Sequence, residues 1–319
     1  MSTTAGDRAA TRRPGTEEPG RFRSYYGQPV VKEPEWTWEV PWYLFAGGLA
    51  GASSGLALGA RLTGRARLAE RARLVAAAGA LASPALLVAD LGRPARFFNM
   101  LRVFKPTSAM SMGSWILALY APAAAGAGLL RALGRLPRVG GMLEEAAAAL
   151  GLPMATYTAV LVADSSIPVW HEARRDLPFV FAGSAAMTAG AAATLLSPAE
   201  EAGPARRLAL AGAVTELAAA EAMQRRLGEI GEVYEQGDTG RFQKAAKACT
   251  ATGAGVLAIG GGARSGRRRA ATLAGSALLL AGGLAQRWAV YRAGFASARD
   301  PKYVVKPQRQ RLETGDGHR

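Results

Sequence analysis

Long runs of uncharged, mostly apolar residues are the feature that most restricts how this chain can fold. Residues 40–60, 106–130 and 177–199 contain no charged side chain over 21, 25 and 23 positions, and arginine-rich clusters separate such runs. About 20 apolar residues span the hydrocarbon core of a bilayer as a helix. The pattern excludes an ordinary soluble core and predicts an all-α, polytopic membrane protein.

The spacing of the runs predicts about eight transmembrane helices, arranged as two four-helix bundles. The sixth helix is the weakest, because Glu216 and Glu221 interrupt it, and seven crossings remain if it lies on the membrane surface. Residues 61–73 are expected to form a basic amphipathic connector, and residues 224–247 an amphipathic, charged stretch. The expected helices span residues 40–60, 74–90, 111–131, 146–168, 177–197, 205–223, 248–263 and 270–291.

Composition divides the chain into three parts. Residues 1–24 are poor in apolar side chains and are expected to form a disordered polar head. Residues 25–299 are expected to form the transmembrane domain, and residues 300–319 a polar C-terminal tail. The whole predicts a multi-pass protein of the cell membrane.

The charge balance is strongly basic, with 39 Lys and Arg against 24 Asp and Glu. The arginines stand at the ends of apolar runs, where they anchor helices to lipid headgroups, so we expect no nucleic-acid partner. Cys249 is the single cysteine, and a [4Fe-4S] cluster needs four. His171 and His318 lie at a helix end and in the tail, so a bis-histidine haem site is not expected.

No residue pattern in the chain predicts catalysis by this chain alone. It contains no phosphate-binding Walker loop, no dinucleotide glycine fingerprint in a strand–helix context, no HExxH motif and no serine–histidine–aspartate arrangement. We therefore expect no metal site here, and any metal-containing cofactor should belong to a partner subunit.

The order of the helices brings polar and aromatic residues together. If the helices cross in sequence, the start of the first and third and the end of the second and fourth reach the same membrane face. Polar residues at membrane depth are costly and indicate a functional site by default. The residues gathered there are Glu39, Trp42, Tyr43, Asp90, Arg93, Ser111, Ser114, Trp115, Tyr157, Asp164 and His171.

Tyr157 and Asp164 are seven residues apart and therefore lie on one face of a helix, roughly 10 Å apart along its axis. A phenol, a carboxyl and nearby indole rings are what a quinone headgroup needs: a hydrogen-bond donor, a proton carrier and apolar walls. In the alternative interpretation, Asp164 forms an ion pair with Arg93 or Arg174, and Tyr157 belongs to the interfacial aromatic belt.

Glycines recur every four residues along the first predicted helix, at Gly47, Gly51, Gly55 and Gly59. Such a groove allows another helix, or a flat ligand, to approach the backbone closely. Helix packing is the favoured interpretation.

Several motifs resemble the NrfD membrane subunits of the polysulfide-reductase type. They are the segment YYGQPVVKEPEWTWEVPWYLFAGGLAGASSG (25–55), DLGRPARFFNMLRVFKPTSAMSMGSW (90–115), the YTxxLxADSSIPVWHEARRDLPFVF stretch (157–181) and DPKYVVKPQRQR (300–311). The likeness extends over most of residues 25–311. It implies an eight-helix, haem-free quinone-binding anchor of a molybdopterin oxidoreductase.

The resemblance also implies cofactors and partners. Menaquinone or ubiquinone would bind without a covalent bond. An iron–sulfur subunit with several [4Fe-4S] clusters would pass electrons between this chain and a molybdopterin catalytic subunit, which determines the substrate. Tyr157 matches the tyrosine that the family places against the quinone, whereas Trp42 and Tyr43 stand where some relatives have a histidine.

The resulting assignment has three groups of residues. Tyr157, Trp42, Tyr43, Trp115 and Ser114 would bind quinone; Asp164, Asp90 and Glu39 would transfer protons; Arg93, Arg96, Arg102, Lys105 and His171 would dock the partner. Two alternatives stay open. One is a transporter or proton-conducting subunit without a redox site, using Glu216, Glu221 and the aspartates expected to be buried, and the other is a structural anchor without a quinone site.

Overall fold

The computed structural model describes residues 30–260 and 265–305, and within them the chain is helical with no β-strand. The predicted head, residues 1–24, lies outside the described residues, as does the tail beyond residue 305. The long helices are rich in Ala and Leu, which favour helix formation. In chain order the elements are α1 (Glu39–Leu62), α2 (Ala66–Asp90), α3 (Arg96–Met100), α4 (Ala109–Ala132), α5 (Pro137–Ala163), α6 (Pro168–Glu172), η1 (Ala173–Arg175), α7 (Leu177–Leu196), α8 (Gly203–Leu227), η2 (Gly228–Tyr234), α9 (Gly237–Gly260) and α10 (Ser265–Arg299).

Five of the described helices are long and apolar enough to cross a membrane, namely α1, α2, α4, α5 and α7. The chain is therefore an all-helical integral membrane protein. The predicted count of eight crossings is not confirmed by this measure. The other long described helices, α8, α9 and α10, have a lower apolar content because charged residues occur along them.

The predicted bounds of α2, α5, α9 and α10 were wrong, and α10 spans Ser265–Arg299 rather than residues 270–291. The expected connector at residues 61–73 is mostly helical, since α2 begins at Ala66. α5 begins at Pro137 rather than near residue 146, and ends at Ala163, where Asp164 takes the C-cap position. α9 begins at Gly237 rather than near residue 248. In these places charged residues that suggested solvent or headgroups belong to helices.

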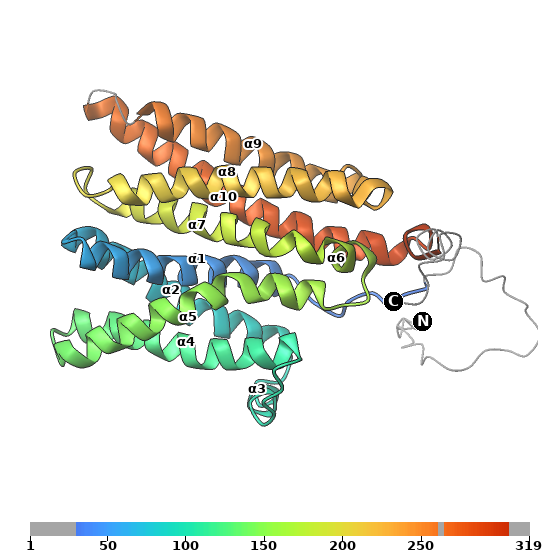
Figure 1. Ribbon diagram of the computed structural model, residues 1–319, viewed down its shortest axis with the longest axis horizontal. Helices are drawn as coiled ribbons and strands as arrows, with labels where there is room; N and C mark the ends of the chain where they lie inside the picture. The colour runs from blue at the N-terminus through green and yellow to red at the C-terminus, as the bar shows by residue number, and fades with distance from the viewer. Residues whose placement is uncertain (1–29, 261–264, 306–319) are drawn as a thin grey trace, which may run out of the picture.

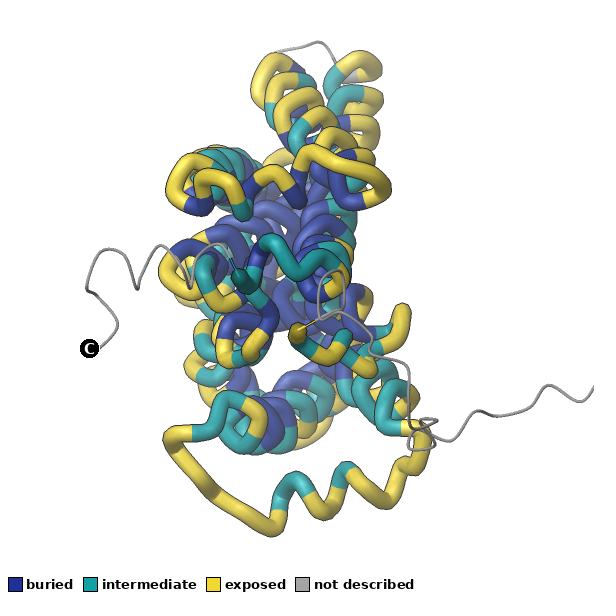
Figure 2. The backbone as a smooth tube through the Cα atoms, turned by 90° about the vertical axis from the view of Figure 1, so that its right-hand side faces the viewer, coloured by how far each residue is buried: buried dark blue, intermediate teal, exposed yellow. Residues whose placement is uncertain are grey.

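The long helices lie side by side along the longest axis of the molecule (Figure 1). α1 packs against α2, α5 and α7, and α4 packs against α2 and α5. α7 in turn contacts α8 and α10, and α10 packs along α9. Viewed along the helices, the surfaces that face one another are buried and the outer surfaces are exposed (Figure 2). The largest buried cluster takes residues from α1, α4, α5, α7 and α10.

The crossing of α1 and α5 depends on two glycines. A Cβ atom at Gly51 would lie 2.4 Å from the carbonyl oxygen of Gly151, and one at Gly151 would lie 2.4 Å from the oxygen of Gly51. Along the same predicted groove, Gly47 faces the side chain of Met154, while Gly55 and Gly59 have open space beside them. The N-terminal half of the groove, with Gly47 and Gly51, therefore serves helix packing.

Candidate functional site

Four helix ends meet at one end of the molecule. α1 and α4 begin there, α2 and α5 end there, and α3 lies in the loop between α2 and α4 (Figure 1). We call this the α3 end. The order of the helices produces this arrangement, because each crossing reverses the direction of the chain. The predicted quinone-binding, proton-transfer and docking residues all come from these helix ends and the segments beside them.

Tyr157 is the predicted site residue whose surroundings are most unusual. Its side chain on α5 is 8% exposed, and its ring lies against Gly113 on α4. The hydroxyl oxygen is buried and has no hydrogen-bond partner among the described residues. Buried polar atoms nearly always have a partner, so an unpaired phenol requires an explanation. Tyr43 on α1 is 3% exposed and belongs to the same buried cluster as Tyr157.

The other predicted quinone contacts have different surroundings. The Ser114 hydroxyl donates a hydrogen bond to the carbonyl oxygen of Met110, 2.8 Å away in the same helix. The indole nitrogen of Trp115 donates to the carbonyl oxygen of Val103 at 3.3 Å, and its ring meets that of Phe104 edge-on. Trp115 thus fixes the loop that precedes α4. Trp42 is 39% exposed and lies at the surface of α1.

The predicted proton carriers Asp90 and Glu39 share a contact with Thr37. Oδ1 of Asp90 accepts hydrogen bonds from the backbone N–H of Thr37 at 3.0 Å and from its hydroxyl at 2.7 Å. The Thr37 hydroxyl also contacts the Glu39 carboxylate. Asp90 therefore ties the end of α2 to the segment before α1. The sequence offered no signal for Thr37, which is 53 residues from Asp90.

Asp164 lies exposed at the end of α5. The alternative ion pair with Arg93 or Arg174 does not form among the described residues. Nη1 of Arg174 instead lies 4.0 Å from the Glu172 carboxylate and donates a hydrogen bond to the carbonyl oxygen of His171 at 3.1 Å. The carboxylate of Asp164 stays accessible to water.

The five predicted docking residues are all exposed. Arg93, Arg96, Arg102 and Lys105 lie on the loop that contains α3, and His171 lies on α6. The same loop exposes large apolar side chains, those of Phe98, Val103 and Phe104. Figure 2 shows this loop as a largely exposed segment along the lower edge of the α3 end.

Aromatic residues from the segment before α1, from α6 and from α10 pack together at the α3 end. Trp170 on α6 is fully buried, stacks on Trp36 with ring centroids 5.2 Å apart, and donates from its indole nitrogen to the carbonyl oxygen of Val290 at 2.7 Å. The hydroxyl of Tyr291 on α10 donates to the carbonyl oxygen of Trp36 at 2.7 Å. These contacts join the segment before α1 to α6 and α10.

An ion pair supports the same junction. The guanidinium of Arg299 donates two hydrogen bonds to the carboxylate of Glu33, at 3.0 and 3.1 Å. Hydrogen bonding to this carboxylate raises the pKa of Arg299. On the same segment, the hydrogen bond from Lys32 lowers the pKa of the exposed Glu35 carboxyl. The lowered pKa favours the ionised form of Glu35, which keeps its ion pair with Lys32.

A second buried polar group lies among α7, α8, α9 and α10. Glu216 on α8 is 1% exposed and accepts a hydrogen bond from the Thr250 hydroxyl at 3.1 Å, while its other carboxylate oxygen has no partner among the described residues. Arg287 on α10 is equally buried and donates to the carbonyl oxygen of Phe181 at 3.2 Å. Glu221 differs: it is exposed enough to pair with Arg225 and Lys247.

No group of three His, Cys, Asp or Glu side chains is placed to hold a metal ion in the part of the chain that the structure describes. In a comparison with protein families, the family model described as polysulfide reductase, of the NrfD type, matches residues 22–299. No curated protein sequence matches the chain.

Proposed function

We propose that this chain, which belongs to the polysulfide reductase family of the NrfD type, is the quinone-exchanging membrane subunit of an oxidoreductase complex. The family match and the five apolar helices support a membrane subunit. The observation that carries the quinone site is the buried, unpaired hydroxyl of Tyr157 at the α3 end. A ligand carbonyl oxygen is the kind of partner that this hydroxyl lacks.

A bound menaquinone or ubiquinone would supply two-electron, two-proton redox chemistry. The protein's part is to bind and orient it. The Tyr157 hydroxyl donates a hydrogen bond to a carbonyl oxygen of the ring, and the buried side chains around Tyr157, Tyr43 among them, exclude water. Asp164, which is exposed at the end of α5, and Asp90 and Glu39 exchange protons with water at the α3 end.

Electrons reach this site from a partner at the α3 end. The exposed loop between α2 and α4 combines basic and apolar side chains, which suits an acidic protein surface with apolar patches. We propose that an iron–sulfur subunit carrying [4Fe-4S] clusters docks there, and that a molybdopterin subunit holds the substrate. In the same proposal α8, α9 and α10 also cross the membrane, which gives eight crossings in two bundles in the cell membrane.

Tyr157→Phe tests the quinone site, and Tyr120→Phe is a matched control. Tyr120 is also a fully buried tyrosine in these helices, but its hydroxyl pairs with that of Ser54 at 2.9 Å. We expect Tyr157→Phe to lower quinol turnover of the intact complex by tenfold or more, on the order of one lost hydrogen bond. Tyr120→Phe should leave turnover within about twofold of the native protein.

Retention of the partner and quinol turnover together decide between the possible outcomes. Both variants should retain the iron–sulfur partner during purification in mild detergent. Normal turnover in Tyr157→Phe would remove the assigned role of this tyrosine, and retention of the partner without any quinone response would leave a structural anchor.

The buried Glu216 favours a second candidate function, proton conduction through α7 to α10. An acid with an unpaired oxygen in a helix bundle is typical of a proton relay. Glu216→Gln would abolish quinol-driven proton uptake in proteoliposomes while electron transfer continues, and Glu221→Gln, a change on the same helix at a half-buried, ion-paired position, would not. Unchanged proton uptake in Glu216→Gln would exclude this function.

A further inference from the structure

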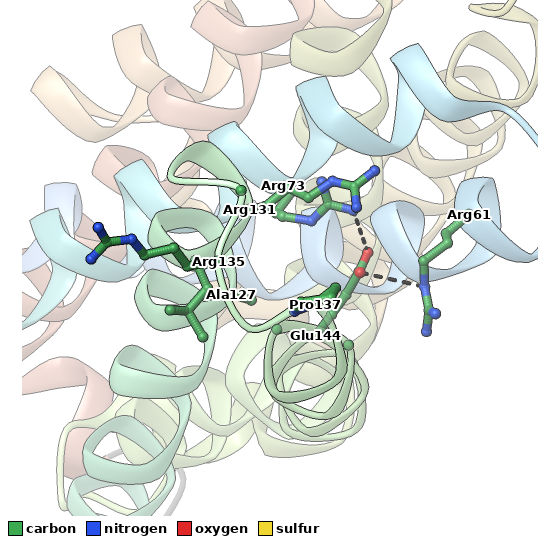
Figure 3. A pocket seen from close by; sticks show the side chains of 11 residues that line it. Arg61, Arg73, Ala127, Arg131, Arg135, Pro137 and Glu144 are labelled. Atoms are coloured by element: carbon green, nitrogen blue, oxygen red, sulfur yellow. Dashed lines mark hydrogen bonds and ion pairs between the residues drawn. The ribbon is translucent and has the colours of Figure 1, made fainter.

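A basic pocket lies at the end of the molecule opposite the α3 end. It has a volume of about 240 Å³ and opens where α1 and α4 end and α2 and α5 begin. Four arginines and one glutamate account for the charged residues of its wall (Figure 3). They are Arg61, Arg73, Arg131, Arg135 and Glu144.

The single acid of the pocket wall is already neutralised. One oxygen of Glu144 lies 3.0 Å from Nη2 of Arg73, and the other lies 3.4 Å from Nε of Arg61. Arg61 also pairs with Glu145 outside the pocket wall, at 2.8 Å. Figure 3 shows Glu144 between Arg73 and Arg61. In this network Arg73 and Glu144 are buried and Arg61 is exposed, and the pocket wall contains no further acid to pair with Arg131 and Arg135.

Arg131 and Arg135 have no ion pair or hydrogen bond to their side chains among the described residues. Both are exposed and stand on the last turn of α4 and in the connection to α5, and Figure 3 shows Arg135 extending away from the ion-paired group. The pocket wall also includes Gly140 and Gly141 in the early turns of α5, where no side chain fills the space. Backbone N–H groups at the start of a helix add a positive potential there.

A second groove adjoins the pocket and shares two of its arginines. It has a volume of about 230 Å³ and lies between α2 and α4, and Arg73 and Arg131 line both cavities. Its wall includes Arg67 and Glu70 as well as the apolar surface of Leu74, Gly128 and Ala132. Beside the two cavities, large apolar side chains are exposed, as in Leu129, Leu133, Leu136 and Met142.

The arrangement matches the interface of a bilayer. Unpaired arginines stand at the level of the helix ends, and exposed apolar side chains continue from them along helices that cross the membrane. Basic pockets between transmembrane helices bind anionic lipid headgroups. We propose that this pocket binds the phosphate group of an anionic phospholipid, whose acyl chain lies along α4. The proposal does not depend on the quinone site.

The double variant Arg131→Gln/Arg135→Gln tests the proposal. Its control is Arg267→Gln/Arg269→Gln, which removes two positive charges from exposed positions near the start of α10, at the same end of the molecule. The full chain would be purified with its natural partners, reconstituted in nanodiscs of phosphatidylcholine, and titrated with phosphatidylglycerol. Bound lipid would be counted by native mass spectrometry, with inorganic phosphate as a separate titration.

We expect the native protein to retain phosphatidylglycerol in preference to phosphatidylcholine. The Arg131→Gln/Arg135→Gln variant should bind it roughly thirtyfold more weakly, the product of two surface arginine contacts, and the control variant should bind it like the native protein. Thermal unfolding in pure phosphatidylcholine should be alike for all three proteins, because neither Arg131 nor Arg135 has a partner to lose. The assignment would be overturned if the two double variants retained equal amounts of phosphatidylglycerol. It would also be overturned if inorganic phosphate, at the same concentration as the lipid, displaced bound phosphatidylglycerol.

Discussion

Gly113 on α4 and the ring of Tyr157 on α5 occupy adjacent space so closely that no side chain fits between them. A Cβ atom at Gly113 would lie 2.3 Å from Cε2 and 2.7 Å from Cδ2 of the tyrosine. The glycine thus determines where the phenol lies, and the buried hydroxyl of Tyr157 keeps its position without a protein partner. This contact links the SMGSW segment of the sequence to the candidate quinone site.

Gly113→Ala should displace the Tyr157 ring. Overpacking costs about 1–3 kcal/mol, and the better helix propensity of alanine offsets up to about 1 kcal/mol of that. We expect a lower midpoint of thermal unfolding and slower quinol turnover. Gly126→Ala on the same helix is the control, because its Cβ would meet only the flexible end of Leu143, at 3.0 Å. Identical turnover in the two variants would show that the position of Tyr157 is immaterial.

Gly51→Ala should separate α1 from α5. The added Cβ would lie 2.4 Å from the Gly151 oxygen, and backbone cannot move aside as a side chain can. We expect a loss of roughly 2–3 kcal/mol in the free energy of unfolding. Gly55→Ala, one turn later and with open space around it, should instead stabilise α1 by about 0.5–1 kcal/mol. Thermal unfolding of the two variants side by side measures the difference, and equal midpoints would refute the close crossing.

Two substitutions distinguish the structural role of Asp90, as a hydrogen-bond acceptor for Thr37, from a role in proton transfer. Asp90→Asn retains the Oδ1 atom that accepts both hydrogen bonds from Thr37, so stability should change little. Asp90→Ala removes the acceptor and should cost about 1–3 kcal/mol. If Asp90 carries protons, Asp90→Asn slows quinol turnover while the protein stays as stable as before. Glu35→Gln, a change at an exposed acid of the same end, serves as the control. Native turnover in Asp90→Asn would show that Asp90 only holds Thr37 and does not transfer protons.

The sequence predicted the apolar helices best where no charge interrupts them. The ranges expected for α1, α4 and α7 agree with the structure to within two residues at each end, because a charge-free run can only be buried in lipid or protein. The start of α5 was missed for a physical reason. Glu144 and Glu145 suggested an external segment, yet Glu144 is 5% exposed inside α5 and pairs with Arg73.

The same pair explains why α2 was expected to begin too late. Arg73 belongs to the supposed basic connector, but it lies buried in α2 because Glu144 neutralises it from 71 residues away. Contacts of this kind have no local signature in a sequence. The candidate site shows the same limit: Tyr157 follows from its motif, whereas its contact with Gly113 and the hydrogen bonds between Asp90 and Thr37 depend on how helices pack.

Gly294→Ala should loosen the aromatic junction at the α3 end. A Cβ atom there would lie 2.0 Å from Cζ2 of Trp170, so the indole would have to leave its place. It would then lose its hydrogen bond to the Val290 carbonyl oxygen and its stacking on Trp36. We expect about 1–3 kcal/mol of destabilisation and faster trypsin cleavage after Lys32, in the segment that Trp36 anchors. Gly266→Ala near the start of the same helix, where nothing lies within 4 Å, should leave both the unfolding midpoint and the cleavage rate unchanged. A native cleavage rate in Gly294→Ala would mean that the segment before α1 is held by Glu33 and Arg299 rather than by the stacked indoles.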